Sequence, residues 1–279
     1  MIWRLTVGRF SLYAIQDGVY HIDPVSVFPD SDSDAWKGVA LARDGMLGIG
    51  IGCFLVTDGD RVFMVDSGMG RWPEAPDKVR ATTGRMPEGL ETLGIGADQV
   101  EMVIHTHLHA DHFGGDVTNS GEAFFPNARL IVHRADVDHF RDAEGWLADR
   151  VREEFLPLVE EGRVDFVHDA KTLVPGIAVE MSPGHTPGHI SVLIDSENNQ
   201  ALVVGDVMHH PLQVQHPTWN WVGDVDPEVA AQTRIKTVQR LAEKGELLAA
   251  GHFPQPGFGR VESSDGSARF EPVATTEIS

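Results

Sequence analysis

Short apolar runs, each bounded by glycine or aspartate, recur over the first 65 residues of the chain. Runs of this length that contain β-branched and aromatic residues are typical of β-strands. The pattern predicts strands at residues 5–7, 10–16, 53–57 and 61–65. Asp58-Gly59 separates the last two runs and favours a tight hairpin turn between them.

From residue 128 onwards, strand-like runs alternate with helical ones. We expect a strand at residues 130–133, helices at 135–140 and 143–159, and several strands within 164–204. A further helix should begin at Asp226-Pro227-Glu228, because Asp is a good cap, Pro suits the first helical position and Glu suits the first turn. Gly245 should end it.

This arrangement predicts an α/β fold in which two sheets pack face to face with helices outside. The length of 279 residues fits one large domain or two smaller ones, and no internal repeat is present. Residues 21–50 contain two prolines, an acidic cluster and several glycines, and we expect a long irregular segment there. Such segments are often functional, so this one is expected either to cover a site or to form a surface loop.

The formal net charge is -20, and two bound divalent cations would bring it only to -16. Proteins bind nucleic acid by neutralising phosphates with Lys and Arg, so this charge argues against nucleic acid and against an anionic membrane as partners. The acidity is best explained by solubility.

The single cysteine, Cys53, cannot form an internal disulfide, so an oxidising compartment is not implied. We expect it to be a small buried apolar residue. The chain has no signal peptide pattern and no run of about 18 apolar residues. These features predict a cytoplasmic protein.

The pattern His-x-His-x-Asp-His places four metal-ligating side chains within six positions, namely His107, His109, Asp111 and His112. Zinc binds imidazole nitrogen and carboxylate oxygen at roughly 2.0–2.2 Å. The preceding run, residues 99–105, is apolar and predicts a buried strand, and Gly114-Gly115 follow where the chain can turn sharply. The ligands are therefore expected on a loop at a strand end, where sites commonly lie.

Three later strand ends also carry a ligand-type residue. His185 lies in the loop Gly184-His-Thr-Pro-Gly-His189, Asp206 ends an apolar run at residues 202–205, and His252 ends another at 247–251. Asp206 could cap a helix, but a carboxylate whose two oxygens can bind two cations suits this position better.

These motifs, with Asp66 in Val62-Phe-Met-Val-Asp-Ser-Gly68, stand in the order of the metallo-β-lactamase superfamily, which the chain resembles over nearly its whole length. The run from Gly205 to Pro211 looks most like the branch of methyl parathion hydrolase and related lactonases. The resemblance implies one domain over residues 1–279, an αββα sandwich with metals at one edge between the sheets. It also implies two metal sites, made of His107, His109 and His185 and of Asp111, His112 and His252, with Asp206 bridging.

By the same resemblance, the two metals share one water, whose pKa falls from 15.7 toward about 7, and the metal-bridging hydroxide is the nucleophile. The catalytic residues would be Asp206, which bridges, and Asp111, which could also carry a proton to the leaving group. Zinc is the expected metal, although this ligand set also accepts Mn, Fe or Co.

Other residues are expected to support the site. Asp66 and His189 should contact the ligands without binding metal, and His105 should orient the loop. His209, three residues past Asp206, is expected either to contact substrate or to hydrogen-bond in the core. The glycine-rich run at residues 48–52 lacks the Lys-Ser/Thr and the helix of a phosphate-binding loop, so we give it no such role. Trp219 and Trp221 are expected in the core, with a pocket wall as the alternative.

The substrate class follows by exclusion within the superfamily. The charge argues against a nuclease, and residues 253–279 are too short and too poor in basic residues for a glyoxalase II. The β-lactamases usually lack Asp at the position of Asp111. Many acyl-homoserine lactonases have Tyr where this chain has His209, and Tyr13 and Tyr20 are the only tyrosines here. We expect a hydrolase of a lactone or ester bond in a small molecule.

Three alternatives stay open. One is an organophosphate triester hydrolase, and another is an iron-dependent redox enzyme such as a persulfide dioxygenase. The third is a binding module that has kept the fold without activity. The resemblance also implies a homodimer.

Overall fold

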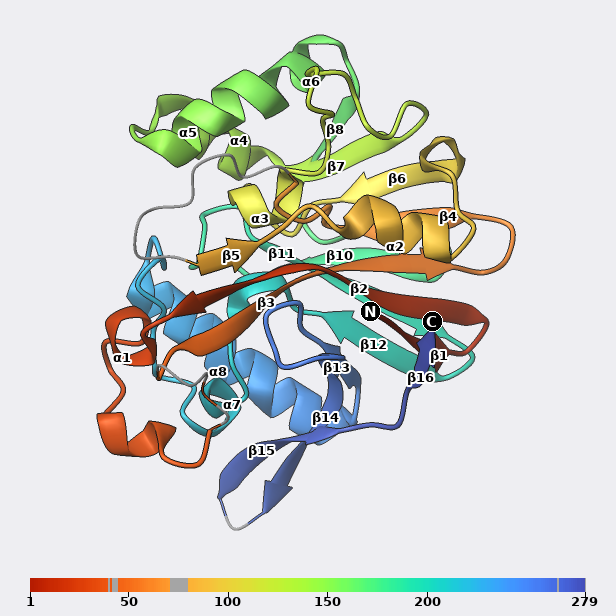
Figure 1. The fold of residues 1–279 in the computed structure, drawn as a ribbon. Helices are drawn as coiled ribbons and strands as arrows, with labels where there is room; N and C mark the ends of the chain where they lie inside the picture. Colours follow the sequence, from red (N-terminus) through yellow and green to blue (C-terminus); the bar gives the residue numbers. More distant parts are fainter. Residues whose placement is uncertain (40, 42–44, 71–79, 265, 279) are drawn as a thin grey trace.

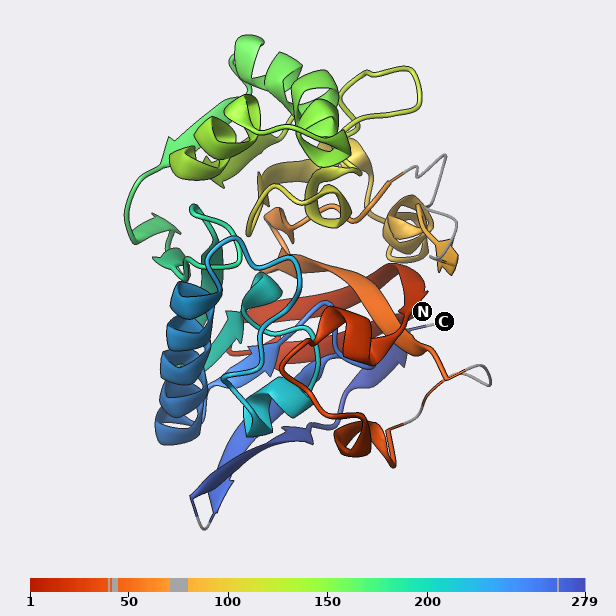
Figure 2. The same cartoon turned by 90° about the vertical axis from the view of Figure 1, so that its left-hand side faces the viewer.

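Two β-sheets lie face to face at the centre of the protein, and helices cover their outer faces in the computed structural model (Figures 1 and 2). The structure describes residues 1–39, 41, 45–70, 80–264 and 266–278. Buried apolar side chains form one layer between the sheets, one between the first sheet and the helices of residues 86–160, and one between the second sheet and the long helix of residues 227–244. This layering is the αββα sandwich, and the predicted fold class is confirmed.

The first sheet joins an antiparallel part to a parallel part. In spatial order its described strands are β16 (Thr276–Ile278), β1 (Ile2–Val7), β2 (Phe10–Ile22), β3 (Leu47–Thr57), β4 (Val62–Val65), β6 (Val100–Ile104), β7 (Arg129–His133) and β8 (Val164–Val167), and β5 (Arg80–Thr82) pairs with β2. Pairing is antiparallel from β16 to β4 and parallel from β4 to β8. All four residues of β4 are buried, as expected for a central strand of a sheet that is covered on both faces.

The second sheet is antiparallel except for one central pair. Its described strands, in spatial order, are β15 (Ser267–Pro272), β14 (Phe258–Ser264), β13 (Leu247–Ala249), β12 (Asn199–Val203), β11 (Ile190–Ser196), β10 (Ile177–Met181) and β9 (Lys171–Val174). Only β12 and β13 run parallel within this part of the chain. Because parallel strands end at the same edge, Asp206 and His252 leave the sheet side by side.

The helices are short apart from one. They are α1 (Pro24–Val27), α2 (Met86–Thr92), α3 (Ala110–Phe113), α4 (Arg134–Asp142), α5 (Trp146–Arg150), α6 (Leu156–Glu160), α7 (Leu212–Gln215) and α8 (Pro227–Lys244), with a π-helical turn at Val151–Phe155 and 3₁₀ turns at Ser33–Trp36, Ala97–Gln99 and Gly205–Val207. Among the described residues, no helix is both long and apolar enough to cross a membrane.

The predicted boundaries of α8 are confirmed. The Asp226 side chain accepts a hydrogen bond from the Val229 N–H at 3.1 Å, and Gly245 ends the helix with φ 64°. The Asp58-Gly59 hairpin between β3 and β4 is also present, and Cys53 is fully buried as predicted. These features are local, so the sequence alone specifies them.

The prediction of an irregular segment over residues 21–50 is wrong at both ends. β2 extends to Ile22 and β3 begins at Leu47, and α1 and one 3₁₀ turn lie between them. Residues 40 and 42–44 fall outside the described part of the chain. The glycines of β3 hide the strand in the sequence, because glycine is depleted in strands on average.

The segment between β2 and β3 has a small apolar cluster of its own. The rings of Phe28 and Trp36 are buried, and Phe28 contacts Trp221 with 5.2 Å between ring centroids. Trp219 lies 6.3 Å from Trp36 and is, like Trp221, half-buried. The two tryptophans therefore belong to the packing between this segment and residues 207–222.

Candidate metal centre

The loop after β6 presents the first four candidate ligands, and Asp66 holds it in shape. Asp66 accepts hydrogen bonds from the Thr106 N–H at 2.7 Å and the Thr106 hydroxyl at 2.9 Å. Its other contact is His112 Nδ1, 2.8 Å from Asp66 Oδ2. His109 then stands at the N-terminal end of the one-turn helix α3, which turns Asp111 and His112 toward the same side. The contacts of Asp66 are those expected of a supporting residue.

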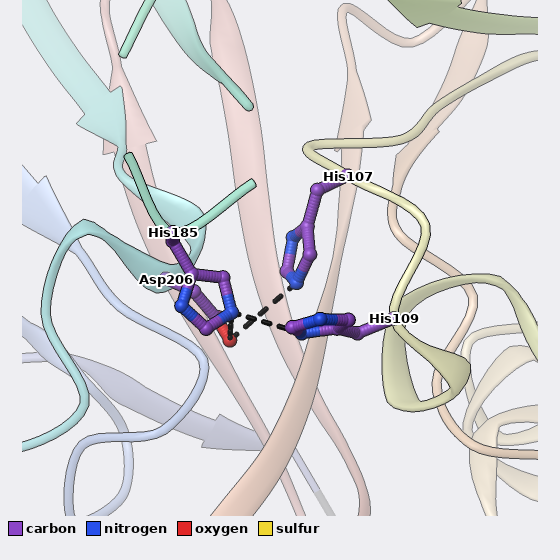
Figure 3. A group of neighbouring side chains, drawn as sticks. All are labelled: His107, His109, His185 and Asp206. Carbon is purple, nitrogen blue, oxygen red and sulfur yellow. Dashed lines mark hydrogen bonds and ion pairs between the residues drawn. The ribbon is translucent and has the colours of Figure 1, made fainter. Parts of the chain in front are cut away.

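The first group of ligands consists of His107, His109, His185 and Asp206 (Figure 3). One nitrogen or carboxylate oxygen from each lies within 4.8 Å of all the others. Asp206 Oδ2 is 3.1 Å from His185 Nε2 and 3.6 Å from His107 Nε2. The side chains come from the loop after β6 in one sheet and from the segments that follow β10 and β12 in the other.

The second group consists of Asp111, His112 and His252, again with ligand atoms within 4.8 Å of one another. Asp206 Oδ1 lies 3.1 Å from both His112 Nε2 and His252 Nε2. Asp206 Oδ1 therefore faces the second group, while Oδ2 faces the first group and also lies 3.3 Å from His252 Nε2, so the carboxylate stands between the two groups.

The donor set fits divalent cations. His107 Nε2, His112 Nε2 and Asp206 Oδ1 are buried atoms whose close contacts lack the geometry of a hydrogen bond. Buried polar atoms are normally paired, and an unpaired one costs about 1–3 kcal/mol. Zn²⁺ or a similar cation would supply the missing partner, because it binds imidazole nitrogen and carboxylate oxygen.

In four of these histidines, Nδ1, the ring nitrogen that points away from the centre, lies next to an oxygen atom. Nδ1 of each ring lies near Thr106 Oγ1 for His107 (3.1 Å), Asp66 Oδ2 for His112 (2.8 Å), Asp224 Oδ1 for His185 (2.8 Å) and Gly50 O for His252 (2.6 Å). A ring that donates a hydrogen bond through Nδ1–H carries an unprotonated Nε2, whose lone pair faces the centre.

Burial and charge act in opposite directions on the site. Burial lowers the pKa of His107 and His109 well below the usual value, and the neighbouring imidazoles lower it further. Burial also disfavours a charged His185, but the Asp206 charge and hydrogen bonds to Asp206 and Asp224 raise its pKa to about 9. Burial would raise the pKa of Asp206, whereas His112 and His252 hold it well below its usual range. Without metal, the centre therefore holds protons where cations would sit.

Two further residues named from the sequence touch Asp206. His189 Nε2 accepts the Asp206 backbone N–H at 2.9 Å, and Ser182 Oγ lies 2.8 Å from His189 Nδ1. His209 is buried with Nε2 3.2 Å from Asp206 Oδ2, and its ring stacks on Trp221 at 4.3 Å. His189 thus supports the ligand loops, while His209 forms with Asp206 and His252 a third group whose ligand atoms lie within 4.8 Å of one another.

His105 lies beneath the loop. Its Nδ1 is 3.2 Å from the His112 carbonyl, and its Nε2 is 2.8 Å from Asp116 Oδ2. Both residues of this pair are buried. His105 therefore contacts the backbone of the ligand loop, as expected of an orienting residue.

Two supporting carboxylates were not identified from the sequence. Asp224 contacts His185 and is itself paired with the buried Arg234 of α8 at 3.3 Å. Asp136 of α4 accepts hydrogen bonds from the Leu108 N–H at 3.0 Å and the Gly188 N–H at 2.6 Å, and so ties the two histidine loops together. An isolated Asp in a helix or loop has no local signal, so neither could be found by pattern.

The glycine-rich run of β3 is explained by close backbone packing. A Cβ atom on Gly52 would lie 2.7 Å from the Gly251 carbonyl oxygen, and one on Gly50 would lie 3.1 Å from it. The turn that carries His252 therefore rests directly on the backbone of β3. This contact brings Gly50 O to His252 Nδ1.

Residues 50–252 match the family model described as the metallo-beta-lactamase superfamily, which spans all seven candidate ligands. The chain belongs to this superfamily. The predicted resemblance is thereby confirmed.

Relatives within the superfamily include lactonases. The chain is 24% identical over 235 residues to the N-acyl homoserine lactonase AiiA of Bacillus thuringiensis subsp. kurstaki, covering 76% of this chain and 85% of that one. It is 24% identical over 252 residues to the N-acyl homoserine lactonase AiiB of Agrobacterium fabrum, covering 79% and 86%. The predicted lactonase-like branch is confirmed by these matches.

Two solved structures share the whole fold of this chain. The hydrolase AbOPH superposes with a TM-score of 0.89 at 25% identity, covering 99% of this chain and 98% of that one. AidC, described as a dizinc quorum-quenching lactonase, superposes with a TM-score of 0.85 at 24% identity over the same shares of the two chains.

Proposed function

We propose that this protein is a metal-dependent hydrolase that opens the lactone or ester bond of a small molecule. The observation that carries the proposal is the position of Asp206, whose carboxylate lies between two groups of buried histidines and contacts members of both. Lactonase relatives within the superfamily support the lactone as the substrate class. The superfamily neighbour AbOPH supports hydrolysis in general.

Two divalent cations are the cofactors that the donor set favours. His107, His109 and His185 would hold one, Asp111, His112 and His252 the other, and Asp206 both. Zinc is the metal we propose, because imidazole and carboxylate suit it and because AidC is a dizinc enzyme. When bound, two such ions lower the pKa of water toward about 7 and polarise the carbonyl group that is attacked.

The residues of this chain supply geometry and proton transfer. Asp206 keeps the two histidine groups in fixed relation, since it contacts members of both. The Asp111 side chain is 14% exposed, compared with 4% for Asp206, so solvent and substrate reach Asp111 more easily. Asp111 can therefore accept the proton that the attacking water loses and give it to the oxygen that leaves the acyl carbon.

The substrate would enter beside His209 and Trp221. The stacked His209 ring and the half-buried indoles give this side of the centre an apolar, aromatic surface. The segment between β2 and β3 packs against the same tryptophans, and we propose that it covers the site. We further propose that residues 1–279 form one domain, because both sheets contribute ligands to a single centre. The homodimer stays a prediction, which analytical ultracentrifugation would test.

The experiment that tests this function is a pH-indicator assay of acid release from acyl-homoserine lactones and simple γ- and δ-lactones. The zinc-loaded protein should release acid, and His107→Ala should not, because one ligand of the first group is missing. Equal release by both proteins would contradict a metal-dependent reaction. Absence of release from every lactone, with activity on phosphotriesters or with iron-dependent oxygen uptake, would replace the proposed function by one of those two.

A further inference from the structure

Tyr20 lies beside the second group of ligands, although it comes from the N-terminal part of the chain. Its hydroxyl donates a hydrogen bond to Asp111 Oδ2 at 3.4 Å. Its ring contacts His252 edge-on, with 6.1 Å between the ring centroids. The phenol therefore touches two of the residues proposed to bind the second cation.

A bulge in β2 gives Tyr20 this orientation. Side chains alternate along a strand, so an even-numbered residue should face the same side as Leu12 and Ala14, which lie between the sheets. The register against β3 shifts between Gln16 and Gly18, which leaves Asp17 as one extra residue. One extra residue turns every later side chain of the strand to the other face of the sheet. Tyr20 therefore packs with the layer between the first sheet and its helices, and not between the two sheets.

The bulge itself is fixed in place. The Asp17 carboxylate is buried and accepts hydrogen bonds from the backbone N–H groups of Met69 at 3.0 Å, Gly84 at 3.1 Å and Met86 at 2.8 Å. Three backbone donors on one carboxylate hold the extra residue in the strand. The backbone of the sheet therefore fixes the direction in which the Tyr20 side chain points.

The Tyr20 hydroxyl is a neutral donor facing an acceptor. A phenol has an ordinary pKa of about 10, so the Tyr20 hydroxyl is protonated at neutral pH and donates to Asp111 Oδ2. Asp111 lies 3.6 Å from His252 Nε2 through Oδ2 and 3.8 Å from His112 Nε2 through Oδ1. The hydrogen bond from the Tyr20 hydroxyl to Oδ2 limits rotation of the Asp111 carboxylate between its two imidazole neighbours.

We propose that Tyr20 is a positioning residue that holds Asp111 in the orientation needed to bind the second cation and to pass a proton to the leaving oxygen. This inference rests on the proposed hydrolase function. In the reaction, the water oxygen bonds to the acyl carbon, the acyl C–O bond breaks, and Asp111 carries the proton from the water to the released alkoxide. Tyr20 keeps its own proton throughout.

The test compares Tyr20→Phe with Tyr13→Phe, which removes the other tyrosine hydroxyl of the same strand. Tyr13 is partly buried on the same layer and stacks beneath Arg4, away from the ligands. Zinc affinity would be measured by competition with a chromogenic chelator. Hydrolysis would be measured on an alkyl lactone, whose leaving oxygen needs a proton, and on a 4-nitrophenyl ester, whose leaving group does not.

Tyr20→Phe should weaken binding of the second zinc by about 10- to 100-fold, the range found when residues that orient metal ligands are changed. At saturating zinc, its kcat should fall by a similar factor on the lactone and little on the nitrophenyl ester, whereas Tyr13→Phe should match the unaltered protein. Unchanged zinc affinity in Tyr20→Phe would overturn the proposal, as would equal losses on both substrates at saturating zinc.

The two proposals can fail separately. If the unaltered protein hydrolyses the lactone and Tyr20→Phe behaves like Tyr13→Phe in every measurement, only the role of Tyr20 is lost. If the unaltered protein hydrolyses neither substrate, the proposed function fails, and zinc affinity alone decides the positioning of Asp111. A weaker second zinc in Tyr20→Phe would then support that positioning, and an unchanged one would overturn it.

Discussion

At the scale of single residues, the centre depends on which nitrogen of each imidazole faces inward. The Nδ1 atoms of four rings are held by a hydroxyl, two carboxylates and a backbone carbonyl, and the Thr106 hydroxyl and the Asp66 carboxylate are themselves hydrogen-bonded. Asp224 differs from the others, because it also accepts a hydrogen bond from the Trp221 backbone N–H at 3.0 Å and pairs with Arg234. It therefore connects His185 to the aromatic wall and to α8.

Asp224→Asn should weaken binding of the first zinc by about 10- to 100-fold. The amide removes the negative charge that holds His185, and its NH₂ group would face the N–H donors of Trp221 or Arg234. Chelator competition would measure the affinity. Asp195→Asn, at an exposed carboxylate of β11, is the matched control and should leave the affinity unchanged. Equal zinc affinity in the two variants would contradict the role of Asp224.

At the scale of elements, irregularities in two neighbouring strands build one side of the centre. The bulge of β2 directs Tyr20 toward Asp111, and the glycines of β3 let the turn before His252 approach. Both departures from a regular strand place groups at the second set of ligands. Without the bulge that set would lose the phenol, and without the glycines it would lose the contact with the Gly50 carbonyl.

Gly52→Ala should destabilise the protein by about 1–3 kcal/mol and weaken the second zinc site, because the new methyl group would push the Gly251 turn away from β3. Gly48→Ala is the control on the same strand, where the nearest atom to a new Cβ is 3.7 Å away. Thermal unfolding and zinc titration of the two variants would check this. If Gly52→Ala were as stable as Gly48→Ala, the close contact between Gly52 and Gly251 would not contribute to stability and the prediction would be wrong.

At the scale of the whole molecule, folding and metal binding are linked. One sheet supplies the loop with His107, His109, Asp111 and His112, and the other supplies His185, Asp206 and His252. The ligands meet only when the sheets are packed, so a bound cation stabilises the packed state. In the metal-free protein, protons on the histidines take part of this role.

The metal-free protein should lose stability as the pH rises from about 6.5 to about 9. The pKa of His185 is raised to about 9 by the balance of burial against Asp206 and Asp224, and an unfolded His titrates near 6.5. Its contribution, on the order of 3 kcal/mol, is therefore complete below pH 6.5 and is lost as the pH passes the folded pKa. Thermal unfolding with a chelator across this range would measure it.

Zinc-loaded protein is the control for this pH series. Protons compete with the cation for the same nitrogens, so zinc binding should strengthen over the range in which the metal-free protein weakens. Parallel pH profiles with and without zinc would contradict the assignment of these histidines to a metal centre.

The sequence by itself determined the features that depend on neighbouring residues. The His-x-His-x-Asp-His loop, the strands before it and after it, the hairpin at Asp58-Gly59 and the caps of α8 all follow from short-range rules of spacing and conformation. The order of the motifs then gave the superfamily, and with it the sandwich.

Only the tertiary structure decided what depends on contacts between distant segments. Asp224 meets His185 across 39 residues and Tyr20 meets Asp111 across 91, and neither carries a local pattern. The length of β2 and β3 was missed because glycines disfavour a strand until a close neighbour such as Gly251 requires them. A bulge of one residue changes no hydrophobic pattern, yet it selects the face of the sheet, so the surroundings of Asp111 became visible only once the strands were paired.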